Sequence, residues 1–301
     1  RAMELAAVNS VFQASLRSPM DAAIARHASL DLSSYTKIDE IPFDFTRRRM
    51  SVIVATSGRR MLITKGAPEG VLEACTRLEL GPDGADVRDM TPELRAAVLD
   101  EFERLSSDGY RAVAVAYRTI GNGREVYSIA DESNMTFVGY VSFVDPPKES
   151  TREALEQAEA LGVEIKILTG DNELVTARIC ERVGLKVKGV LMGQDVDALD
   201  DGELAARAEQ ATVCARLSPD QKDRIIAALK RSGHVVGYMG DGINDAPSLR
   251  TADVGVSVSN AVDVAREAAD VIPLEEGLDV LETEIVEGRK TFANTLKYIM
   301  M

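Results

Sequence analysis

The chain has 301 residues, of which 45% are hydrophobic and 5% aromatic, and its formal net charge is −14. This length exceeds what one compact core usually holds, so two domains are expected. The negative charge argues against a general nucleic-acid binder, which needs a basic face, but it leaves room for a nucleotide site built from a few lysines and arginines. The three cysteines show neither metal-binding nor disulfide spacing, and no apolar run is long enough to span a membrane.

The first part of the chain predicts mixed α and β structure. Residues 9–16 and a segment that begins at Pro19 are typical of helices. Two β-rich runs, 50–54 and 60–64, flank the turn formers at 57–58 and predict a hairpin.

Further elements of the same kind follow along the chain. Pro68 can begin a short helix, and residues 81–84 form a turn. Residues 91–105 predict a helix that Thr91 caps, and 111–117 predict a strand. This first part is therefore expected to pair its strands antiparallel.

After residue 135 apolar strands alternate with amphipathic helices. The predicted strands are 137–144, 163–168, 235–239, 254–258 and 271–274. The predicted helices are 151–161, 173–183 and 220–230. This alternation is typical of a parallel sheet covered on both faces, and it places a domain boundary near residue 138.

Acidic, turn-rich loops follow three of these strands. They are Asp145–Lys148, Thr169–Asp171 and Gly240–Asp245. Because chemistry gathers beyond the carboxyl ends of parallel strands, we expect all three loops at one edge of one sheet.

The loop Gly240–Asp245 combines two carboxylates and an amide on a turn, a hard-oxygen set that suits Mg²⁺. The alternative is an Asx-turn that caps a helix. Thr169–Asp171 offers a hydroxyl and a helix N-terminus to a phosphoryl group, unless Asp171 or Asn172 only caps that helix. Lys222 is either a solvated lysine or a point charge that offsets developing negative charge on a phosphoryl oxygen.

Four segments together resemble the ordered motif series of the P-type ATPases. They are Lys65-Gly66-Ala67-Pro68-Glu69, Asp145-Pro146-Pro147-Lys148, Thr169-Gly170-Asp171 and Gly240-Asp241-Gly242-Ile243-Asn244-Asp245-Ala246-Pro247. The resemblance implies a nucleotide-binding (N) domain over 1–137, an incomplete phosphorylation (P) domain of the haloacid-dehalogenase type over 138–284, and a helix over 285–301 that leads to the membrane.

For the P domain the resemblance implies roles at matching positions. Thr169, with Gly170 and Asp171 beside it, would hold the phosphoryl group, and Lys222 would neutralise the aspartyl phosphate. Asp241, together with Asp245, would ligate Mg²⁺. The supporting polar residues would be Asn244 and Asp145.

For the N domain the resemblance implies an ATP pocket. Phe43 would stack on adenine, Lys65 with Gly66 would lie at the base of the pocket, and Arg111 would meet the phosphates. Asp21 stands where the family usually has a Glu near the adenine.

Other readings of the aromatic and basic residues around this pocket remain open. Phe45 stands where calcium pumps carry a charged residue, so the choice between Phe43 and Phe45 stays open, as does a plain core role for either. The run Arg47–Arg49 is either a solvated strand edge or a phosphate contact.

Segments 37–45, 47–52 and 287–294 resemble the bacterial magnesium-translocating members of the family. The implied function is ATP hydrolysis through an aspartyl phosphate, coupled to Mg²⁺ transport at the cytoplasmic face of the inner membrane. The alternatives are a pump of another cation such as Ca²⁺, a non-catalytic ATP-binding module, and a free-standing phosphatase of the same superfamily.

The family's phosphorylated Asp lies in an Asp-Lys-Thr-Gly-Thr segment, which the 301 residues do not contain. It is expected before residue 1, so the P-domain sheet should lack its first strand and this chain alone should bind ATP without turning it over. The implied partners are ATP, the transported divalent cation, and the rest of the pump with its actuator domain and membrane helices. Nucleic acid is not expected among them.

Overall fold

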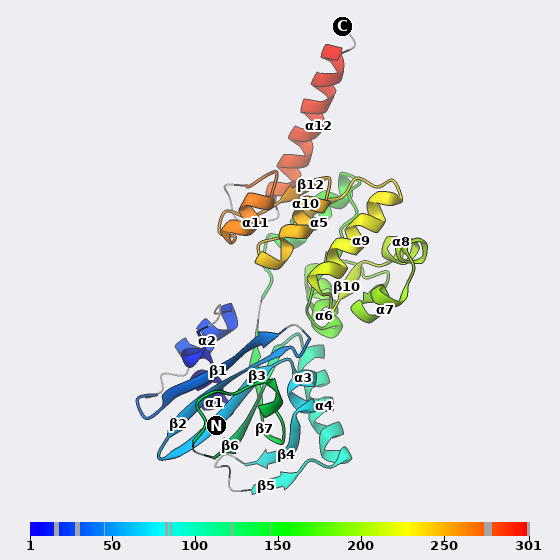
Figure 1. The fold of residues 1–301 in the computed structure, drawn as a ribbon. Coiled ribbons are helices and arrows are strands. Elements are labelled where there is room, and N and C mark those ends of the chain that lie inside the picture. The colour runs from blue at the N-terminus through cyan, green and yellow to red at the C-terminus, as the bar shows by residue number, and fades with distance from the viewer. Residues whose placement is uncertain are drawn as a thin grey trace. The chain divides into compact units, whose positions relative to one another are not determined.

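The computed structural model describes residues 1–14, 18–27, 31–44, 46–81, 84, 86–121, 123–144, 146–273 and 279–299. The chain forms two compact units, Arg1–Asp145 (unit 1) and Pro146–Met301 (unit 2). Figure 1 shows both, unit 1 from blue to green and unit 2 from green to red.

Unit 1 is built on one seven-stranded sheet. In spatial order its strands are β1 (Thr36–Asp44), β2 (Arg49–Thr56), β3 (Arg59–Gly66), β6 (Arg111–Ile120), β7 (Met135–Phe143), β4 (Cys75–Leu80) and β5 (Asp86–Asp89). Neighbouring strands are antiparallel except β4 and β7, which are parallel. The antiparallel pairing predicted from the sequence is therefore confirmed for most of this sheet.

Helices pack on both faces of the unit 1 sheet. They are α1 (Ala2–Phe12), α2 (Pro19–His27), α3 (Pro68–Glu73) and α4 (Pro92–Ser107), with a short 3₁₀ helix η1 (Ile129–Asp131). Since side chains alternate along a strand, Val52 packs with residues of α1 and α2 while Ile53 packs with residues of α3 and α4. We call these two sides the α1/α2 face and the α3/α4 face.

Several local predictions for unit 1 are confirmed. In the β2–β3 hairpin, Ser57 and Gly58 both have positive φ, 48° and 75°, as a two-residue turn with matching twist requires. The Thr91 hydroxyl accepts a hydrogen bond from the Leu94 amide at 3.3 Å and caps α4. Helix α1 covers Ala2–Phe12, in agreement with the helical character predicted for the start of the chain, and the end of the predicted segment 9–16 lies outside the described residues.

The prediction that 137–144 opens a parallel sheet is wrong. This segment is β7, which pairs antiparallel with β6 and parallel with β4 inside unit 1. Its apolar residues are buried on both faces, Phe137 on the α3/α4 face and Val141 on the α1/α2 face. A strand covered on both faces has the same apolar pattern in either kind of sheet. The two units consequently divide after residue 145. The prediction that all three acidic loops lie at one edge of one sheet is also wrong, because β7, β8 and β11 belong to three different sheets in the described residues.

Unit 2 contains two small sheets in which every described pair is parallel. One holds β8 (Ile167–Leu168), β10 (Val213–Ala215) and β9 (Val190–Met192), in that order. The other holds β11 (Gly237–Met239) and β12 (Val254–Val256), with a single bridge from Val256 to Val271. The predicted strands 163–168, 235–239 and 254–258 are therefore shorter than expected, and residue 274 lies outside the described residues.

The helices of unit 2 alternate with these strands as the sequence predicts. They are α5 (Thr151–Ala160), α6 (Glu173–Val183), α7 (Gly193–Ala198), α8 (Asp201–Gln210), α9 (Pro219–Arg231), η2 (Ile243–Asp245), α10 (Ala246–Thr251), α11 (Asp263–Ala268) and α12 (Asp279–Ile299). Among the described helices of the chain, none has the length and apolar character needed to cross a membrane.

Helix α9 packs against both small sheets. Ile225 lies in a core with Leu191 of β9 and Cys214 of β10, whereas the next residue, Ile226, lies in a core with Tyr238 of β11. In the described part of unit 2 no hydrogen-bonded ladder joins β8 to β11. Side-chain packing around α9 therefore contributes much of what holds the two sheets in one unit.

Candidate nucleotide and phosphoryl sites

The first candidate site centres on Lys65, the penultimate residue of β3. Its ammonium forms an ion pair with Asp21 of α2 and donates to the Ser10 hydroxyl of α1 at 2.6 Å. The Ser10 hydroxyl in turn donates to Asp21 Oδ1 at 2.9 Å. Lys65 and Asp21 are only 7% and 6% exposed, so the structure brings two of the predicted site residues into direct contact.

Local sequence explains how Asp21 reaches this place. Pro19 lies at the start of α2, where its missing N–H is not needed. Both the amide and the hydroxyl of Ser18 donate to Asp21 Oδ2, at 2.9 and 2.7 Å, which fixes the carboxylate at the helix start. On α1, the Asn9 side chain donates to the Ile63 carbonyl at 2.8 Å and ties that helix to β3. The Asp21 carboxylate is thus fixed at the start of α2, and α1, which carries Ser10, is fixed to β3, which carries Lys65.

The electrostatics of this pair follow from its burial. Burial opposes ionisation of Asp21, but the hydrogen bond and charge of Lys65, together with the Ser18 hydroxyl, outweigh it and hold the pKa of that carboxyl well below its ordinary value. Burial lowers the pKa of Lys65, while the hydrogen bond and charge of Asp21 act in the opposite direction. The ammonium is therefore poorly solvated and depends on nearby negative charge.

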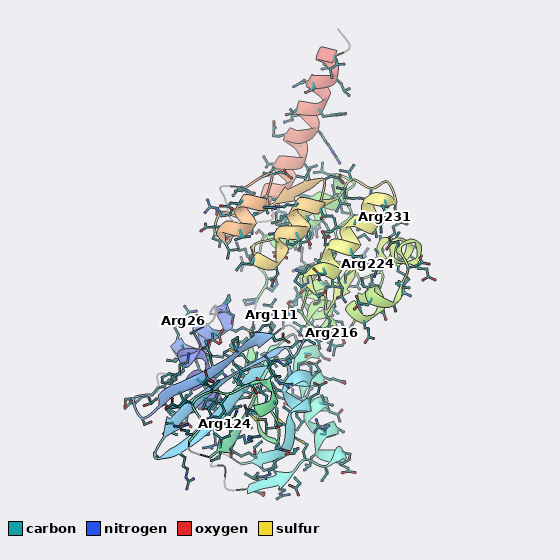
Figure 2. All side chains as sticks on the ribbon, in the orientation of Figure 1. Arg26, Arg111, Arg124, Arg216, Arg224 and Arg231 are labelled. Carbon is teal, nitrogen blue, oxygen red and sulfur yellow. The ribbon has the colours of Figure 1, made fainter. Side chains whose placement is uncertain are left out.

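Phe43 and Arg111 lie at the same end of the sheet as Lys65. Asp44, the residue after Phe43, pairs with Arg49, which pairs with Gly66. Arg111, which is labelled in Figure 2, is the first residue of β6. It stands three positions before Ala114, which pairs with Gly66. Phe43 is 47% exposed, and Arg111 is half-buried. Phe45 lies outside the described residues, so the choice between the two phenylalanines stays a prediction.

Gly66 has a packing role. A Cβ at this position would collide with the carbonyl oxygen of Arg48, which accepts a hydrogen bond from the Ala67 amide at 2.8 Å. The turn between β1 and β2 therefore lies directly against the segment that follows Lys65.

The second candidate site centres on Lys222 in the first turn of α9. Its ammonium lies 2.8 Å from Asp245 Oδ1. The same oxygen accepts from the Tyr238 hydroxyl at 2.7 Å, and Asp245 Oδ2 accepts from the Gly242 amide at 3.1 Å. Burial opposes ionisation of Asp245, but these donors outweigh it and hold the pKa of the carboxyl below its ordinary value. Burial and the neighbouring carboxylates raise the pKa of Tyr238, which stays a neutral donor.

Thr169, Gly170 and Asp171 follow β8. The Thr169 amide donates a hydrogen bond to the Cys214 carbonyl at 2.9 Å, and the Thr169 carbonyl accepts one from the Leu217 amide at 3.0 Å. The Thr169 hydroxyl accepts from the Asp171 amide at 3.0 Å, and Gly170 is exposed. The cap of α6 is Asn172, whose side chain accepts from the Leu174 amide at 2.7 Å. Capping is therefore the role of Asn172, not of Asp171.

Asp241 and Asn244 lie exposed in the loop after β11. The loop is held by its backbone, since the Gly240 carbonyl accepts from the Ser257 hydroxyl at 3.0 Å and the Asp241 carbonyl accepts from the Val262 amide at 3.2 Å. Asp145 lies outside the described residues. Within the ranges that the structure describes, no group of three or more acidic, His or Cys side chains gathers to hold a metal.

The donor set nevertheless fits Mg²⁺. This ion commonly takes one or two carboxylates and completes its shell with waters and phosphate oxygens. Asp241 offers an exposed carboxylate, whereas the carboxylate of Asp245 already accepts from Lys222, Tyr238 and Gly242. Asp241 therefore fits a direct ligand better than Asp245 does.

Three polar residues of these sites were not expected from the sequence. Ser10 lies 55 positions from Lys65, and no spacing rule connects them. Ser18 stands directly before the Pro19 helix start, a pattern that could have identified it as a cap. Tyr238 lies seven positions before Asp245 in the strand that leads to the acidic loop, a place where an inward polar side chain could have been anticipated.

Comparisons with known proteins give a consistent result. Residues 10–150 match the family model described as P-type ATPase, cytoplasmic domain N. The chain is 47% identical to "Magnesium-transporting ATPase, P-type 1" of Escherichia coli (strain K12), over 100% of this chain and 34% of that protein. The protein of the same name from Salmonella typhimurium (strain 14028s) is also 47% identical, over 98% of this chain and 33% of its own length.

A calcium-transporting relative is less similar. "Calcium-transporting ATPase" of Bacillus subtilis (strain 168) is 33% identical, over 89% of this chain and 30% of that protein. The chain spans about a third of the length of the magnesium-transporting relatives it matches.

Proposed function

This chain belongs to the P-type cation-transporting ATPases, and we propose that unit 1 binds ATP while unit 2 carries residues that hold the transferred phosphoryl group. The buried Lys65–Asp21 pair carries the proposal for unit 1. It places a poorly solvated ammonium at the end of the sheet where Phe43 and Arg111 also lie.

Each residue of unit 1 has a distinct role in this proposal. The exposed ring of Phe43 stacks on adenine, a contact that needs only one exposed face of the ring. The Lys65 ammonium, fixed by Asp21 and Ser10, supplies positive charge in a place of low dielectric constant. Arg111 supplies a planar guanidinium, the group best matched to phosphate oxygens.

In unit 2 the proposed roles follow from the hydrogen bonds. Because the Thr169 oxygen accepts from the Asp171 amide, its O–H hydrogen is available to donate to a phosphoryl oxygen. Lys222 supplies an ammonium that Asp245 and Tyr238 keep in place. Asp241 would hold Mg²⁺, which when bound neutralises charge on phosphoryl oxygens. The phosphorylated aspartate itself would come from the Asp-Lys-Thr-Gly-Thr segment that these 301 residues lack.

We further propose a haloacid-dehalogenase-type P domain for unit 2 and Mg²⁺ transport at the cytoplasmic face of a membrane for the whole pump. The parallel pairing of its strands and the loops after β8 and β11 support the first statement. The second is supported by identities of 47% to magnesium-transporting relatives against 33% to a calcium-transporting one.

ATP titration by calorimetry tests the unit 1 site. Phe43→Ala removes an exposed ring and should leave folding intact while it weakens ATP binding about tenfold or more. Lys65→Ala should weaken binding as well, and its thermal unfolding must be checked because Lys65 is buried. A matched control is Ile129→Ala, which removes another exposed apolar side chain of unit 1 and should not change the affinity. Unchanged affinity in both site variants would refute the ATP site.

Mg²⁺ titration followed by amide NMR shifts tests the unit 2 site. Asp241→Asn should reduce the Mg²⁺ affinity, because an amide oxygen is a weaker ligand for this ion than a carboxylate. Asp263→Asn, in α11, removes an exposed carboxylate of the same unit and serves as control. Equal Mg²⁺ affinity in the two variants would contradict the role given to Asp241.

A further inference from the structure

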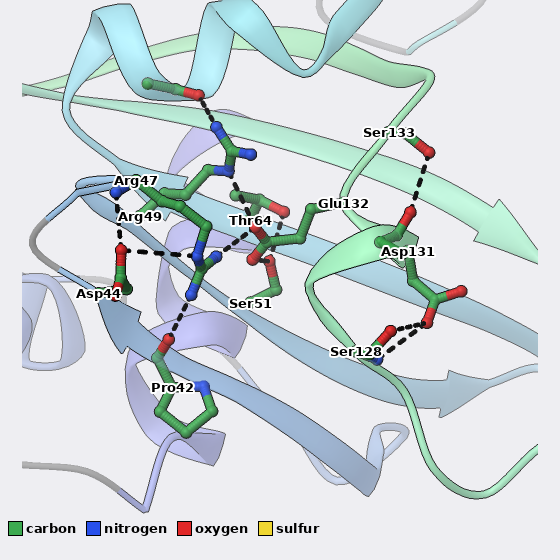
Figure 3. Close-up of polar contacts among 12 residues, drawn as sticks. Pro42, Asp44, Arg47, Arg49, Ser51, Thr64, Ser128, Asp131, Glu132 and Ser133 are labelled. Atoms are coloured by element: carbon green, nitrogen blue, oxygen red, sulfur yellow. Dashed lines mark hydrogen bonds and ion pairs between the residues drawn. The ribbon is translucent and has the colours of Figure 1, made fainter.

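A buried carboxylate, Glu132, binds two arginines on the α3/α4 face of unit 1 (Figure 3). Its side chain is fully buried. Glu132 Oε2 accepts from Arg47 and from Arg49, the latter at 2.9 Å. Glu132 Oε1 accepts from the Ser51 hydroxyl at 2.7 Å, and Ser51 shares a 2.7 Å hydrogen bond with Thr64. We call these five residues the Glu132 cluster.

The cluster holds the turn between β1 and β2. Arg47 donates from its side chain to the Pro42 carbonyl at 2.9 Å and from its amide to Asp44 Oδ1 at 2.8 Å. The Arg48 amide donates to the Asp44 carbonyl at 2.7 Å, with Arg48 in the left-handed region at φ 51°. A non-glycine residue at such a φ needs support from its surroundings. The Glu132–Arg47 pair supplies that support on both sides of Phe43, at Pro42 and at Asp44.

Two glycines seat the same turn against the Lys65 segment. A Cβ on Gly66 would collide with the Arg48 carbonyl, and a Cβ on Gly70 would collide with the Arg47 carbonyl. Arg49 also donates to the carbonyl of Gly70, the second residue after Pro68 in α3. The turn is thereby clamped between Glu132 on one side and residues 66–70 on the other.

The three consecutive arginines, Arg47–Arg49, differ in their environments. The guanidinium groups of Arg47 and Arg49 are engaged by Glu132 and by backbone carbonyls, while Arg48 is exposed. Neither a solvated strand edge nor a set of phosphate contacts therefore describes Arg47 and Arg49. Both guanidinium groups instead bind the buried carboxylate of Glu132, which lies more than 80 positions further along the chain.

We infer that Glu132 is a positioning residue for nucleotide recognition, acting through Arg47 and Arg49 on the turn that follows Phe43. This inference rests on the proposed ATP site. Glu132 has no contact with Lys65 among the described hydrogen bonds and ion pairs, so it acts by fixing the place of Phe43 relative to the Lys65 strand. Misplacing a recognition group by about 1 Å can cost on the order of a hundredfold in function.

The test compares two buried carboxylates of unit 1. Glu132→Gln keeps the shape and removes the charge that binds two arginines. Glu79→Gln likewise keeps the shape and removes a buried negative charge in β4, where the Glu79 carboxylate pairs with one arginine, Arg1, at 2.9 Å and the Glu79 side chain is 1% exposed. Both variants should lower the thermal stability, since each removes a buried carboxylate from an ion pair. Only Glu132→Gln should weaken ATP binding, by about tenfold to a hundredfold.

A second readout does not need ATP. The sequence contains no Trp, so Phe43→Trp introduces a single Trp near the end of β1, and this Trp can be excited selectively over the tyrosines. In the folded, ATP-free protein, Glu132→Gln should lower the fluorescence anisotropy of this Trp, and Glu79→Gln should leave it unchanged. Equal anisotropy and equal ATP affinity in the two glutamine variants would overturn the inference. A fall in anisotropy with no ATP binding in any variant would instead refute the ATP site and leave the positioning of the turn intact.

Discussion

Lys65 in unit 1 and Lys222 in unit 2 each pair with an aspartate, but the two pairs are supported differently. Lys65 lies near the end of β3, an interior strand of a continuous seven-stranded sheet, and the side chains of its pair are both 8% exposed. Lys222 comes from the first turn of α9, next to two small sheets, and the side chains of its pair are 15% and 12% exposed. The first lysine is enclosed by its own unit, and the second keeps a path to solvent.

This difference fits the roles proposed for the two lysines. A lysine that only binds the nucleotide can be fixed deep in a sheet, where a low dielectric constant strengthens the electrostatic interactions of its charge. A lysine that is to contact a phosphoryl oxygen needs a side that remains accessible. The Lys222–Asp245 pair is more exposed than the Lys65–Asp21 pair, and Asp245, which also accepts from Tyr238 and Gly242, holds the Lys222 ammonium in place.

The largest expected effect is on the pair in unit 1. Lys65→Ala leaves the Asp21 carboxylate buried without its charge partner and should lower the free energy of unfolding by about 3–5 kcal/mol. Lys222→Ala should cost about 1–2 kcal/mol, because the side chains of the Lys222–Asp245 pair are more exposed to water. Denaturant unfolding followed by NMR signals of each unit measures both. Equal losses would show that enclosure does not distinguish the two pairs.

The second expected effect concerns the two small sheets of unit 2, in contrast to the single sheet of unit 1. Ile226→Ala should destabilise unit 2 by about 2–4 kcal/mol and speed amide exchange in β11 and β12. The matched variant Ile225→Ala, one position earlier in α9, should speed exchange in β9 and β10 instead. Both residues are at most 1% exposed, so they differ in the sheet they contact and not in burial. Identical exchange patterns would mean that the two sheets open as one.

The smallest expected effect concerns pH. The pKa of Asp21 in the folded chain lies below its ordinary value of 3.8, so its carboxylate stabilises unit 1 at higher pH and this stabilisation is lost as the pH falls below that value. The difference in unfolding free energy between the wild type and Asp21→Asn should stay constant down to about pH 5 and shrink by about 1 kcal/mol by about pH 3. Urea titrations at several pH values measure it. A difference that grows on acidification would reverse the inferred direction of the pKa shift.

Local elements could be predicted because their causes are local. The β2–β3 hairpin follows from Ser57 and Gly58, and α4 begins where Thr91 can cap it. The sheet membership of β7 could not, because an apolar run of this length suits any strand with both faces covered. Strand β10, in the centre of its sheet, is only three residues long and gives no periodic signal.

For the sites, the sequence by itself determined which residue types are present and, through their motifs, the chemistry that they suit. Lys65, Thr169, Lys222 and Asp241 were all identified in this way. Only the tertiary structure decided their partners. The pairs Lys65–Ser10, Lys222–Asp245 and Arg47–Glu132 join residues 55, 23 and 85 positions apart. The physical reason is that a pattern along the chain shows that a side chain must be buried, whereas the neighbours that satisfy its charge are set by how distant elements pack.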